Sequence, residues 1–291
     1  YSRALLESGA VKVFGIDKDP NVIKLSQDLS EEFSGRFSFF LGKFSKVEEF
    51  VDKAIVDGVI FDLGVSSMQL DQAKRGFSFR HDGPLDMRMG EGGLSAADIV
   101  NSFEEEEIAD ILFQYGEEKS SRLIAKKIVS ARPITSTLSL STIIHGCFNN
   151  RTDTKTHPAT KSFQALRIAV NDELAELVRG LEAAERILKP GGELVVVTFH
   201  SLEDRIVKKF LRSRSIGKGN ANRHSPTSEN VSPSFILKSS KPYLVKDNER
   251  QSNPRSRSAK LRIAIRSDAD PFSPQRKKLG LPKLAMKSLT L

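Results

Sequence analysis

Three polar residues each follow a short apolar, β-branched run of the kind that forms a buried parallel strand. They are Asp17, Asp62 and His200. Because ligands bind at the carboxyl ends of strands in open α/β sheets, we expect these side chains around one crevice. An acid at the end of the second strand of a βαβ unit commonly accepts hydrogen bonds from a ribose hydroxyl pair. The pattern therefore predicts a nucleotide-bearing cofactor but does not identify it.

Each candidate also has a structural interpretation. Asp17 could cap the next helix, but Asp19 directly precedes Pro20 and is better placed to do so, which favours a ligand role for Asp17. His200 is equally compatible with a proton carrier or base contact and with a structural histidine. Phe44 follows the strand expected at 36–41, at the same edge. A ring there can stack on a nucleobase, although phenylalanine is more commonly a core residue.

The segment 57–89 is the most unusual stretch of the chain. It begins with the strand that precedes Asp62 and continues as a long connection that glycine and proline punctuate. Charged residues are interleaved there with Phe77, Phe79 and three methionines. Loops of this length in compact domains are usually functional, and a solvated surface loop rarely carries so many large apolar side chains. We therefore expect a functional loop.

Hydrophobic periodicity predicts the elements that must position these residues. Helices are expected at 47–55 and from about 174 to 188, with Lys189–Gly192 ending the second one. Four strands are expected at 11–16, 36–41, 58–61 and 193–199. Two later strands, at 234–238 and 259–266, are expected to join the sheet in antiparallel orientation.

Between residues 95 and 156 the sequence shows only helical periodicity, and no strand is evident. The sequence thus predicts an α/β core formed by residues 1–94 and 157–267, an all-helical insertion at 95–156, and a basic tail at 268–291. The acidic run Glu104–Glu107 is expected to be a solvated first helical turn and not a metal site, and no metal is predicted.

Composition bounds the class of protein. A chain of 291 residues with 38% hydrophobic residues can bury a sizeable core, and no apolar run approaches the length of a membrane span. The single cysteine, Cys147, excludes an internal disulfide and suits a reducing compartment. We therefore expect a soluble globular protein.

Charge is distributed unevenly. Residues 211–291 hold 18 Lys and Arg against 5 Asp and Glu, whereas the preceding 210 residues are net acidic, and the whole chain carries +8. Such asymmetry indicates a polyanionic partner, most simply a nucleic acid. A solvated basic tail without a dedicated partner is the alternative.

The first ten residues read as a helix already under way, which ends at Gly9. The chain starts with Tyr1 and shows no signal or transit segment. We therefore expect a truncated chain, with a strand and a loop ahead of its first residue.

Four motifs, in order, resemble a known family over nearly the whole chain. They read DLGVSSMQLDQAKRGFSFRHDGPLDMRM, HPATKSFQALRIAVN, FHSLEDRIVKKF and NPRSRSAKLR. The chain resembles the bacterial small-subunit ribosomal RNA cytosine-N4 methyltransferases, the RsmH or MraW family. The resemblance implies a class I, Rossmann-like methyltransferase fold with an inserted all-helical domain. It also implies S-adenosylmethionine as methyl donor and a cytosine of the ribosomal decoding region as acceptor.

The resemblance implies roles for several residues at the cofactor. Asp17 would hold the ribose, Phe44 would lie beside the adenine, and Asp62 and Gln69 would also contact the cofactor. The glycine-rich loop of the family normally ends in His-Ser or Tyr-Ser, so Tyr1 and the serine that follows it resemble the end of that loop.

Chemistry at the acceptor sets further expectations. The exocyclic N4 of cytosine is a poor nucleophile because its lone pair is delocalised, so accepting hydrogen bonds and proton loss would help. Asp62 is not followed by the Pro-Pro-aromatic motif of many amino-directed methyltransferases, so their catalytic role is not assigned to it. We expect Asp82 or Asp86 to orient or deprotonate the amino group, with His200 contacting the base.

RNA contacts are expected from two further sets of residues. The target base must be splayed out to reach the methyl group, and Phe77 and Phe79 are candidates to stack on it. Phosphate and other RNA contacts are expected from four residues of the matching motifs, Arg167, Asn171, Arg255 and Arg257. The partner is small-subunit ribosomal RNA or the assembled subunit, with a homodimer left open and no membrane.

Three rival functions remain open at the level of sequence. One is an amino-directed methyltransferase that acts on DNA or another RNA. Another is a dinucleotide-dependent oxidoreductase, because Asp17 suits an NAD ribose equally well. The third is a non-catalytic ribosome-assembly factor. We expect a cytoplasmic protein, with the mitochondrial matrix as the alternative.

Overall fold

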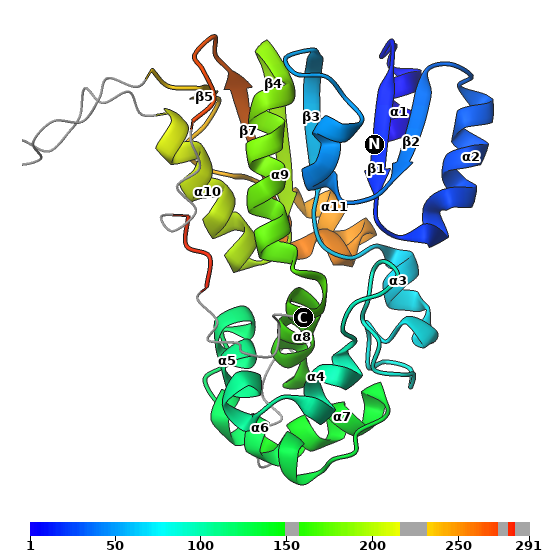
Figure 1. The fold of residues 1–291 in the computed structure, drawn as a ribbon, viewed down its shortest axis with the longest axis vertical. Helices are drawn as coiled ribbons and strands as arrows, with labels where there is room; N and C mark the ends of the chain where they lie inside the picture. Colours follow the sequence, from blue (N-terminus) through cyan, green and yellow to red (C-terminus); the bar gives the residue numbers. More distant parts are fainter. Residues whose placement is uncertain (149–156, 216–231, 273–278, 283–291) are drawn as a thin grey trace, which may run out of the picture. The chain divides into compact units, whose positions relative to one another are not determined.

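The computed structural model describes residues 1–148, 157–215, 232–272 and 279–282 (Figure 1). The chain divides into two units, which we describe separately. The α/β unit comprises Tyr1–Gly64 and Leu174–Leu281, and the helical unit comprises Val65–Glu173. Most of the tail predicted at 268–291 lies outside the described residues.

The first two strands of the α/β unit form a small parallel sheet. β1 (Val13–Asp17) pairs with β2 (Phe37–Leu41) so that Asp17 lies opposite Leu41. The connection between them contains the 3-10 turn η1 (Pro20–Val22) and helix α2 (Ile23–Glu32), while helix α1 (Ser2–Glu7) precedes β1. The parallel pairing places the ends of both strands at the same edge of the sheet.

The remaining strands form a separate five-stranded sheet. At its centre β4 pairs in parallel with β3, with Asp62 opposite Val197, and antiparallel with β7. Two short strands, β5 and β6, also pair antiparallel with β7, which confirms the predicted antiparallel addition. The strand bounds are β3 (Val56–Asp62), β4 (Leu188–Thr198), β5 (Phe235–Leu237), β6 (Tyr243–Leu244) and β7 (Lys260–Arg266).

Side chains, and not backbone hydrogen bonds, join the two sheets within the described residues. Phe14 and Ile16 of β1 and Val56 and Val59 of β3 pack against one apolar cluster, which consists of Val47, Val51, Ala183 and Ile187. No strand among the described residues pairs with the second edge of β1 or of β3. The unit therefore has two hydrogen-bonded layers with an apolar seam between them.

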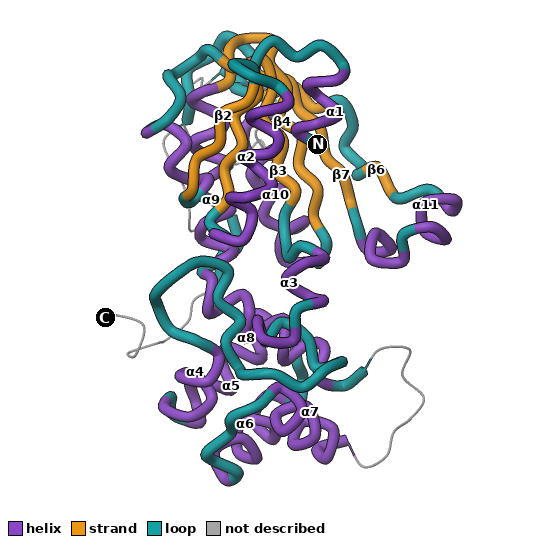
Figure 2. The backbone as a smooth tube through the Cα atoms, turned by 90° about the vertical axis from the view of Figure 1, so that its right-hand side faces the viewer, coloured by secondary structure: helices purple, strands orange, loops and turns teal. Residues whose placement is uncertain are grey.

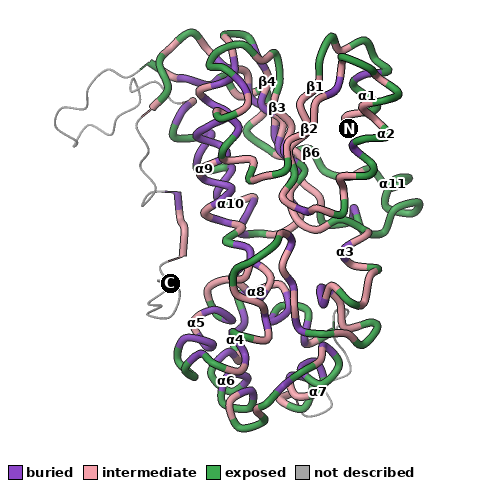
Figure 3. The backbone as a smooth tube through the Cα atoms, turned by 45° about the vertical axis from the view of Figure 1, so that its right-hand side comes forward, coloured by how far each residue is buried: buried purple, intermediate pink, exposed green. Residues whose placement is uncertain are grey.

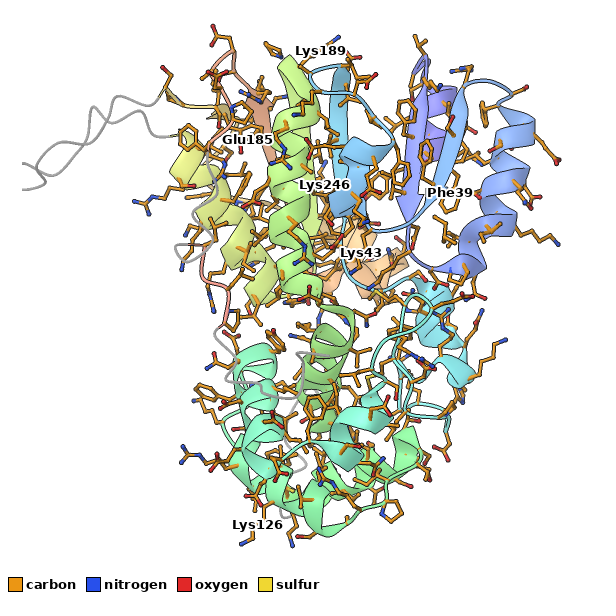
Figure 4. The ribbon with its side chains drawn as sticks, viewed as in Figure 1. Phe39, Lys43, Lys126, Glu185, Lys189 and Lys246 are labelled. Atoms are coloured by element: carbon orange, nitrogen blue, oxygen red, sulfur yellow. The ribbon has the colours of Figure 1, made fainter. Side chains whose placement is uncertain are left out.

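Helix α9 (Glu173–Ile187) is buried along most of its length, whereas helix α10 (Ser201–Ser215) alternates buried and exposed residues (Figure 3). A buried ion pair ties them together, because Arg214 Nε of α10 donates to Oε2 of Glu185 in α9 at 2.7 Å; Glu185 is labelled in Figure 4. The Ser234 hydroxyl also donates to the carboxylate of Glu185, and Arg266 Nε donates to its backbone carbonyl oxygen. This network fixes the late strands β5 and β7 to the helices.

A short helical arm follows β6. It consists of α11 (Asp247–Ser252) and the 3-10 turn η6 (Pro254–Ser258), and it lies on the other side of the α/β unit from β2 (Figure 2). Its residues are exposed apart from Ser256, whose hydroxyl donates to Asn253 O at 2.7 Å. The arm then leads directly into β7.

Two local predictions are wrong. The helix expected at 47–55 is only a 3-10 turn, η2 (Phe44–Glu49), because the amides of Ala54 and Ile55 bond to the carbonyl oxygens that end α9 and draw the chain into an extended path. The helix expected from about 174 to 188 does end at Ile187, but the strand expected to begin at 193 already includes Lys189–Gly192 as part of β4. It bulges there, since Val56 pairs with Leu188 and Gly58 already pairs with Glu193.

The helical unit has six α-helices within its described residues. Its core gathers apolar residues of α5, α6 and α8 with the buried Leu85, Met87 and Met89 of the preceding loop. The helix bounds are α3 (Ser67–Asp71), α4 (Ala96–Ser102), α5 (Glu105–Gly116), α6 (Ser121–Ser130), α7 (Thr137–His145) and α8 (Ala159–Asn171).

The helical unit is larger than the insertion predicted at 95–156. It takes in residues 65–94 and 157–173 because Phe77 and the loop methionines, together with Phe163 of α8, pack into its core. The α/β fold with many helices agrees with the predicted class. No helix in the described part of the chain is long and apolar enough to cross a membrane.

Candidate functional site

Asp17 lies where the sequence placed it, at the end of β1. Its Oδ1 accepts the backbone N–H of Asp19 at 2.8 Å. Asp19 itself is buried and caps the following 3-10 turn by accepting from Asn21 N at 3.0 Å. Desolvation by surrounding protein atoms raises the pKa of Asp17, although the residue is exposed. The capping task therefore belongs to Asp19, as expected, and Asp17 has the environment of a ligand-facing acid.

Phe44 opens η2, directly beyond β2. Its ring centroid lies 5.1 Å from that of Phe61, and the ring rests against Gly180 of α9, where an added β-carbon would lie 2.3 Å from it. The next residue, Ser45, donates through its backbone N and its hydroxyl to the buried Glu176 carboxylate, both at 2.9 Å. The ring is thus half-buried and held in place, as a stacking surface requires.

Asp62 ends β3 and is brought together with Tyr1. Burial raises the pKa of the Tyr1 hydroxyl, and the charge of Asp62 raises it further. Burial likewise raises the pKa of Asp62, with an additional contribution from the carboxylate of Glu203. Tyr1 and Asp62, both predicted to contact the cofactor, therefore share one electrostatic environment at the edge where the strands end.

His200 follows β4 and begins α10. Its Nε2 lies 3.1 Å from Oε1 of Glu203, and the two side chains are 9% and 3% exposed. The other carboxylate oxygen of Glu203 accepts the backbone N–H of Phe199 at 2.8 Å and of His200 at 3.3 Å. Sequence reasoning named His200 but missed Glu203, although a glutamate three residues after a helix start is a capping signal.

In the helical unit, the loop at Met87 is clamped on both sides. Met87 is fully buried and has a φ of 61°, which is rare for a non-glycine residue. Asn171 donates from Nδ2 to Met87 O at 2.7 Å and accepts from Met89 N at 2.9 Å. Arg75 Nη2 donates to the carbonyl oxygens of Arg88 and Met89 at 3.0 and 3.1 Å. Such strain persists only where the surroundings over-determine it.

Asp86 lies within this clamped loop and pairs with Arg88. Its Oδ1 and Oδ2 accept from Arg88 Nε and Nη2, each at 2.8 Å, and these hydrogen bonds lower the pKa of Asp86. Asp82 accepts the backbone N–H of Leu138 at 3.0 Å. This bond, with further hydrogen bonds from Ser136, Gly83 and Thr137, lowers the pKa of Asp82. Both carboxylates are held as anions by local donors, and catalysis by either stays a prediction.

The two candidate stacking residues belong to the core of the helical unit. Phe77 is 7% exposed. Phe79 is partly buried, with ring centroids 4.6 Å from His157 and 4.8 Å from Phe163 in an edge-on contact. His157 also stacks on His145 at 5.7 Å. Stacking of either phenylalanine on an RNA base stays a prediction.

Three further candidates of the helical unit make local contacts. Gln69 is buried and completes a capping box with Ser66, whose N–H donates to Gln69 Oε1 at 2.9 Å. Arg167 pairs with Glu173 through two hydrogen bonds of 2.8 Å, and Asn171 holds the loop as described above. Contact of Gln69 with a cofactor, and of Arg167 and Asn171 with RNA, stays a prediction.

Arg255 and Arg257 lie on the arm of the α/β unit, and both are exposed. Between them the buried Ser256 anchors η6, so the two guanidinium groups are carried on a fixed turn. Two exposed arginines with one residue between them suit phosphate contacts. Their position agrees with the predicted RNA role but does not test it.

Known proteins match this chain over nearly its whole length. The model of the MraW methylase family matches residues 1–267. A ribosomal RNA small subunit methyltransferase H from Cereibacter sphaeroides is 52% identical over 99% of this chain and 87% of its own length. Proteins of the same description from Roseobacter denitrificans and Methylorubrum extorquens are 53% and 54% identical, over 97% and 92% of this chain and 86% and 78% of their own.

Proposed function

The chain belongs to the MraW methylase family, and from this membership we propose that it is a methyltransferase which modifies N4 of a cytosine in the decoding region of small-subunit ribosomal RNA. The observation that carries the proposal is the likeness to proteins described as ribosomal RNA small subunit methyltransferase H, at 52 to 54% identity over at least 92% of this chain.

S-adenosylmethionine fits the residues at the strand ends of the α/β unit. Asp17 is an acid beyond β1 that suits a ribose hydroxyl pair, and the half-buried ring of Phe44 offers a flat apolar surface for an adenine. Asp62 places negative charge near Tyr1, and Glu203 adds negative charge near Asp62, which suits a cationic ligand. When bound, this cofactor supplies a methyl group on a positively charged sulfur, already activated for transfer.

RNA binding is proposed to rest on the basic late part of the chain. The charge of +13 carried by residues 211–291 favours a polyanion, and the exposed Arg255 and Arg257 present guanidinium groups that match phosphate oxygens. Phe77, Phe79, Arg167 and Asn171 keep their predicted RNA roles as part of this proposal.

Proton handling at the amino group is assigned to His200 before the two aspartates. An imidazole can accept a proton near neutral pH, whereas the local donors to Asp82 and Asp86 stabilise their anions and make them weaker bases. Asp82 and Asp86 remain proposed to orient the amino group by accepting its hydrogen bonds.

The test is a methyl-transfer assay with labelled S-adenosylmethionine and four separate acceptors. These are small ribosomal subunits, their isolated RNA, large-subunit RNA and DNA. We expect label only with the first two, at N4 of one cytosine, and the ratio between them identifies the preferred substrate. Label in DNA or in other RNA would favour the amino-directed rival.

Two controls address the other rivals. Binding of NAD without binding of S-adenosylmethionine would support the oxidoreductase. RNA binding without cofactor binding would support the assembly factor. The relatives named above are bacterial, which does not support the mitochondrial alternative, so we propose a cytoplasmic location. A homodimer is left open in this proposal, and light scattering measures the oligomeric state.

A further inference from the structure

Glu203 uses its two carboxylate oxygens for different tasks. Oε2 accepts the backbone N–H groups of Phe199 and His200, at 2.8 and 3.3 Å, which closes the first turn of α10 as in a capping box. Oε1 lies 3.1 Å from Nε2 of His200. Because the two backbone donors hold Oε2 in place, the second oxygen is kept beside the imidazole.

The imidazole of His200 is buried. Its side chain is 9% exposed, and among the described residues neither ring nitrogen makes a hydrogen bond of good geometry. A buried polar group without a partner costs free energy, so an imidazole left in this state requires a reason. A ligand that supplies the missing partner is the simplest one.

The nearby carboxylate decides which ring nitrogen carries the proton of the neutral imidazole. A lone pair on Nε2 would lie 3.1 Å from a carboxylate oxygen, off the direct line of a hydrogen bond, and would still be repelled by its charge, whereas a proton there is attracted. In a neutral histidine one nitrogen donates and the other accepts, so a proton on Nε2 leaves the lone pair on Nδ1. Carboxylate groups fix the tautomer of functional histidines in this way.

We propose that Glu203 is a positioning residue that holds His200 as the Nε2–H tautomer, so that Nδ1 accepts the proton which the cytosine amino group loses on methylation. The inference rests on the proposed function. An amino group carries only donors, so it needs an acceptor, and the Nδ1 lone pair is one. The opposite tautomer would present an N–H to it instead.

The proton balance is closed. When the neutral amino nitrogen takes up a methyl cation, it carries two protons and one positive charge. The sulfur that gave up the methyl group becomes neutral. Nδ1 of His200 accepts one proton, which leaves a neutral N-methylamino group on the base and a positive imidazolium. That charge faces the Glu203 carboxylate, and the proton passes to solvent as the product leaves.

The first test needs no mutation. Long-range proton–nitrogen correlation spectra of the protein with labelled histidine identify the tautomer of His200, assigned by its loss in His200→Ala. We expect the Nε2–H form. A predominant Nδ1–H form would overturn the inference while leaving the proposed methyltransferase function untouched.

The second test is Glu203→Gln, which keeps an oxygen for the helix cap and can turn its NH₂ toward Nε2. We expect the tautomer to switch to Nδ1–H and kcat to fall about 100-fold, the usual contribution of a general base, with KM for cofactor and RNA little changed. In a His200→Ala background, Glu203→Gln is expected to reduce kcat no further. An equal loss of kcat in both backgrounds would mean that Glu203 acts only through the fold.

Failure of this inference and failure of the proposed function are distinguishable. A protein that transfers no methyl group to small-subunit RNA fails the function, yet its tautomer can still be read. A protein that methylates normally but shows no tautomer switch and no kcat loss in Glu203→Gln fails only the inference.

Discussion

Two pairs of aspartates, one in each unit, have opposite electrostatic surroundings. Asp17 and Asp62 end parallel strands of the α/β unit, and desolvation by surrounding protein atoms raises the pKa of both, although both residues are exposed. Asp82 and Asp86 lie in the loop of the helical unit, and hydrogen-bond donors lower the pKa of both. The first pair has charge that the protein itself leaves poorly compensated, which suits a ligand. The second pair has its charge satisfied by neighbours, which suits a loop that must keep its shape.

The comparison predicts that changes in the helical loop cost stability and changes at the strand ends cost affinity. Asn171→Ala should give the largest effect, because it leaves the buried Met87 O and Met89 N without their partner. We expect a loss of about 3 kcal/mol in the free energy of unfolding, from two orphaned backbone groups. Urea titration measures it, with the exposed Asn248→Ala as control. A loss below that of the control would mean that the clamp is unimportant.

Gly180→Ala is expected to lower both stability and cofactor affinity, so it is an exception to the comparison. The new β-carbon would meet the Phe44 ring at 2.3 Å, so the ring must move. Overpacking of this kind costs about 1–3 kcal/mol. Cofactor affinity should fall as well, measured by calorimetry. Gly146→Ala is the matched control, since nothing lies within 4 Å of its added carbon. Unchanged affinity at reduced stability would exclude Phe44 from the cofactor site.

Asp62→Asn and Asp86→Asn sharpen the comparison directly. Loss of one charge-assisted contact is worth about 1.5–3 kcal/mol, so Asp62→Asn should weaken S-adenosylmethionine binding by at least about tenfold. Asp86→Asn should leave that affinity unchanged. S-adenosylhomocysteine, which lacks the positive charge, should discriminate less between the wild type and Asp62→Asn. The reverse pattern would assign the ligand role to the loop.

Stability should also respond to pH in opposite directions. The pKa of Asp86 is lowered by folding, so its contribution is present above the unfolded value of about 3.9 and is lost as pH falls through the folded value. The pKa of Asp62 is raised, so its charge opposes folding above the folded value, and Asp62→Asn should stabilise the protein at neutral pH. Effects below about 1 kcal/mol are expected for such partly exposed groups. If Asp62→Asn and Asp86→Asn changed the free energy of unfolding in the same direction at neutral pH, the assignment would be contradicted.

The smallest effect is expected on the RNA side. Arg257→Ala should weaken binding at every RNA sequence and reduce the slope of log affinity against log salt by about 0.7. Lys126→Ala, on the exposed face of α6, serves as the control for a general loss of charge (Figure 4). Equal slopes for the two variants would remove η6 from the RNA-binding surface.

Much of the α/β unit was predictable because its signals are local. Strand ends at Asp17, Asp62 and His200 follow from runs of apolar residues beside them. Glu203 was also within reach, because its capping bonds span only three or four residues. The antiparallel return of β7 followed from the same kind of pattern.

What the sequence did not reveal depends on distant partners. Asp82 is held by Leu138, and Phe44 needs the space left by Gly180, in each case across more than fifty residues. The extent of the helical unit was missed for the same reason, since Met87 and Phe163 are apolar in any context and only packing assigns them to one core. Periodicity reports which face of an element is buried, but not against what.

The apolar seam between the two sheets has a consequence for cooperativity. Within the described residues no ladder crosses from β1 to β3, so packing on the cluster of Val47, Val51, Ala183 and Ile187 is what couples the two layers. Asp17 lies on one layer and Asp62 on the other. A ligand held by both would bind only where the two layers pack together, and it would add its binding free energy to their coupling. Affinity and local folding are then two readings of one equilibrium.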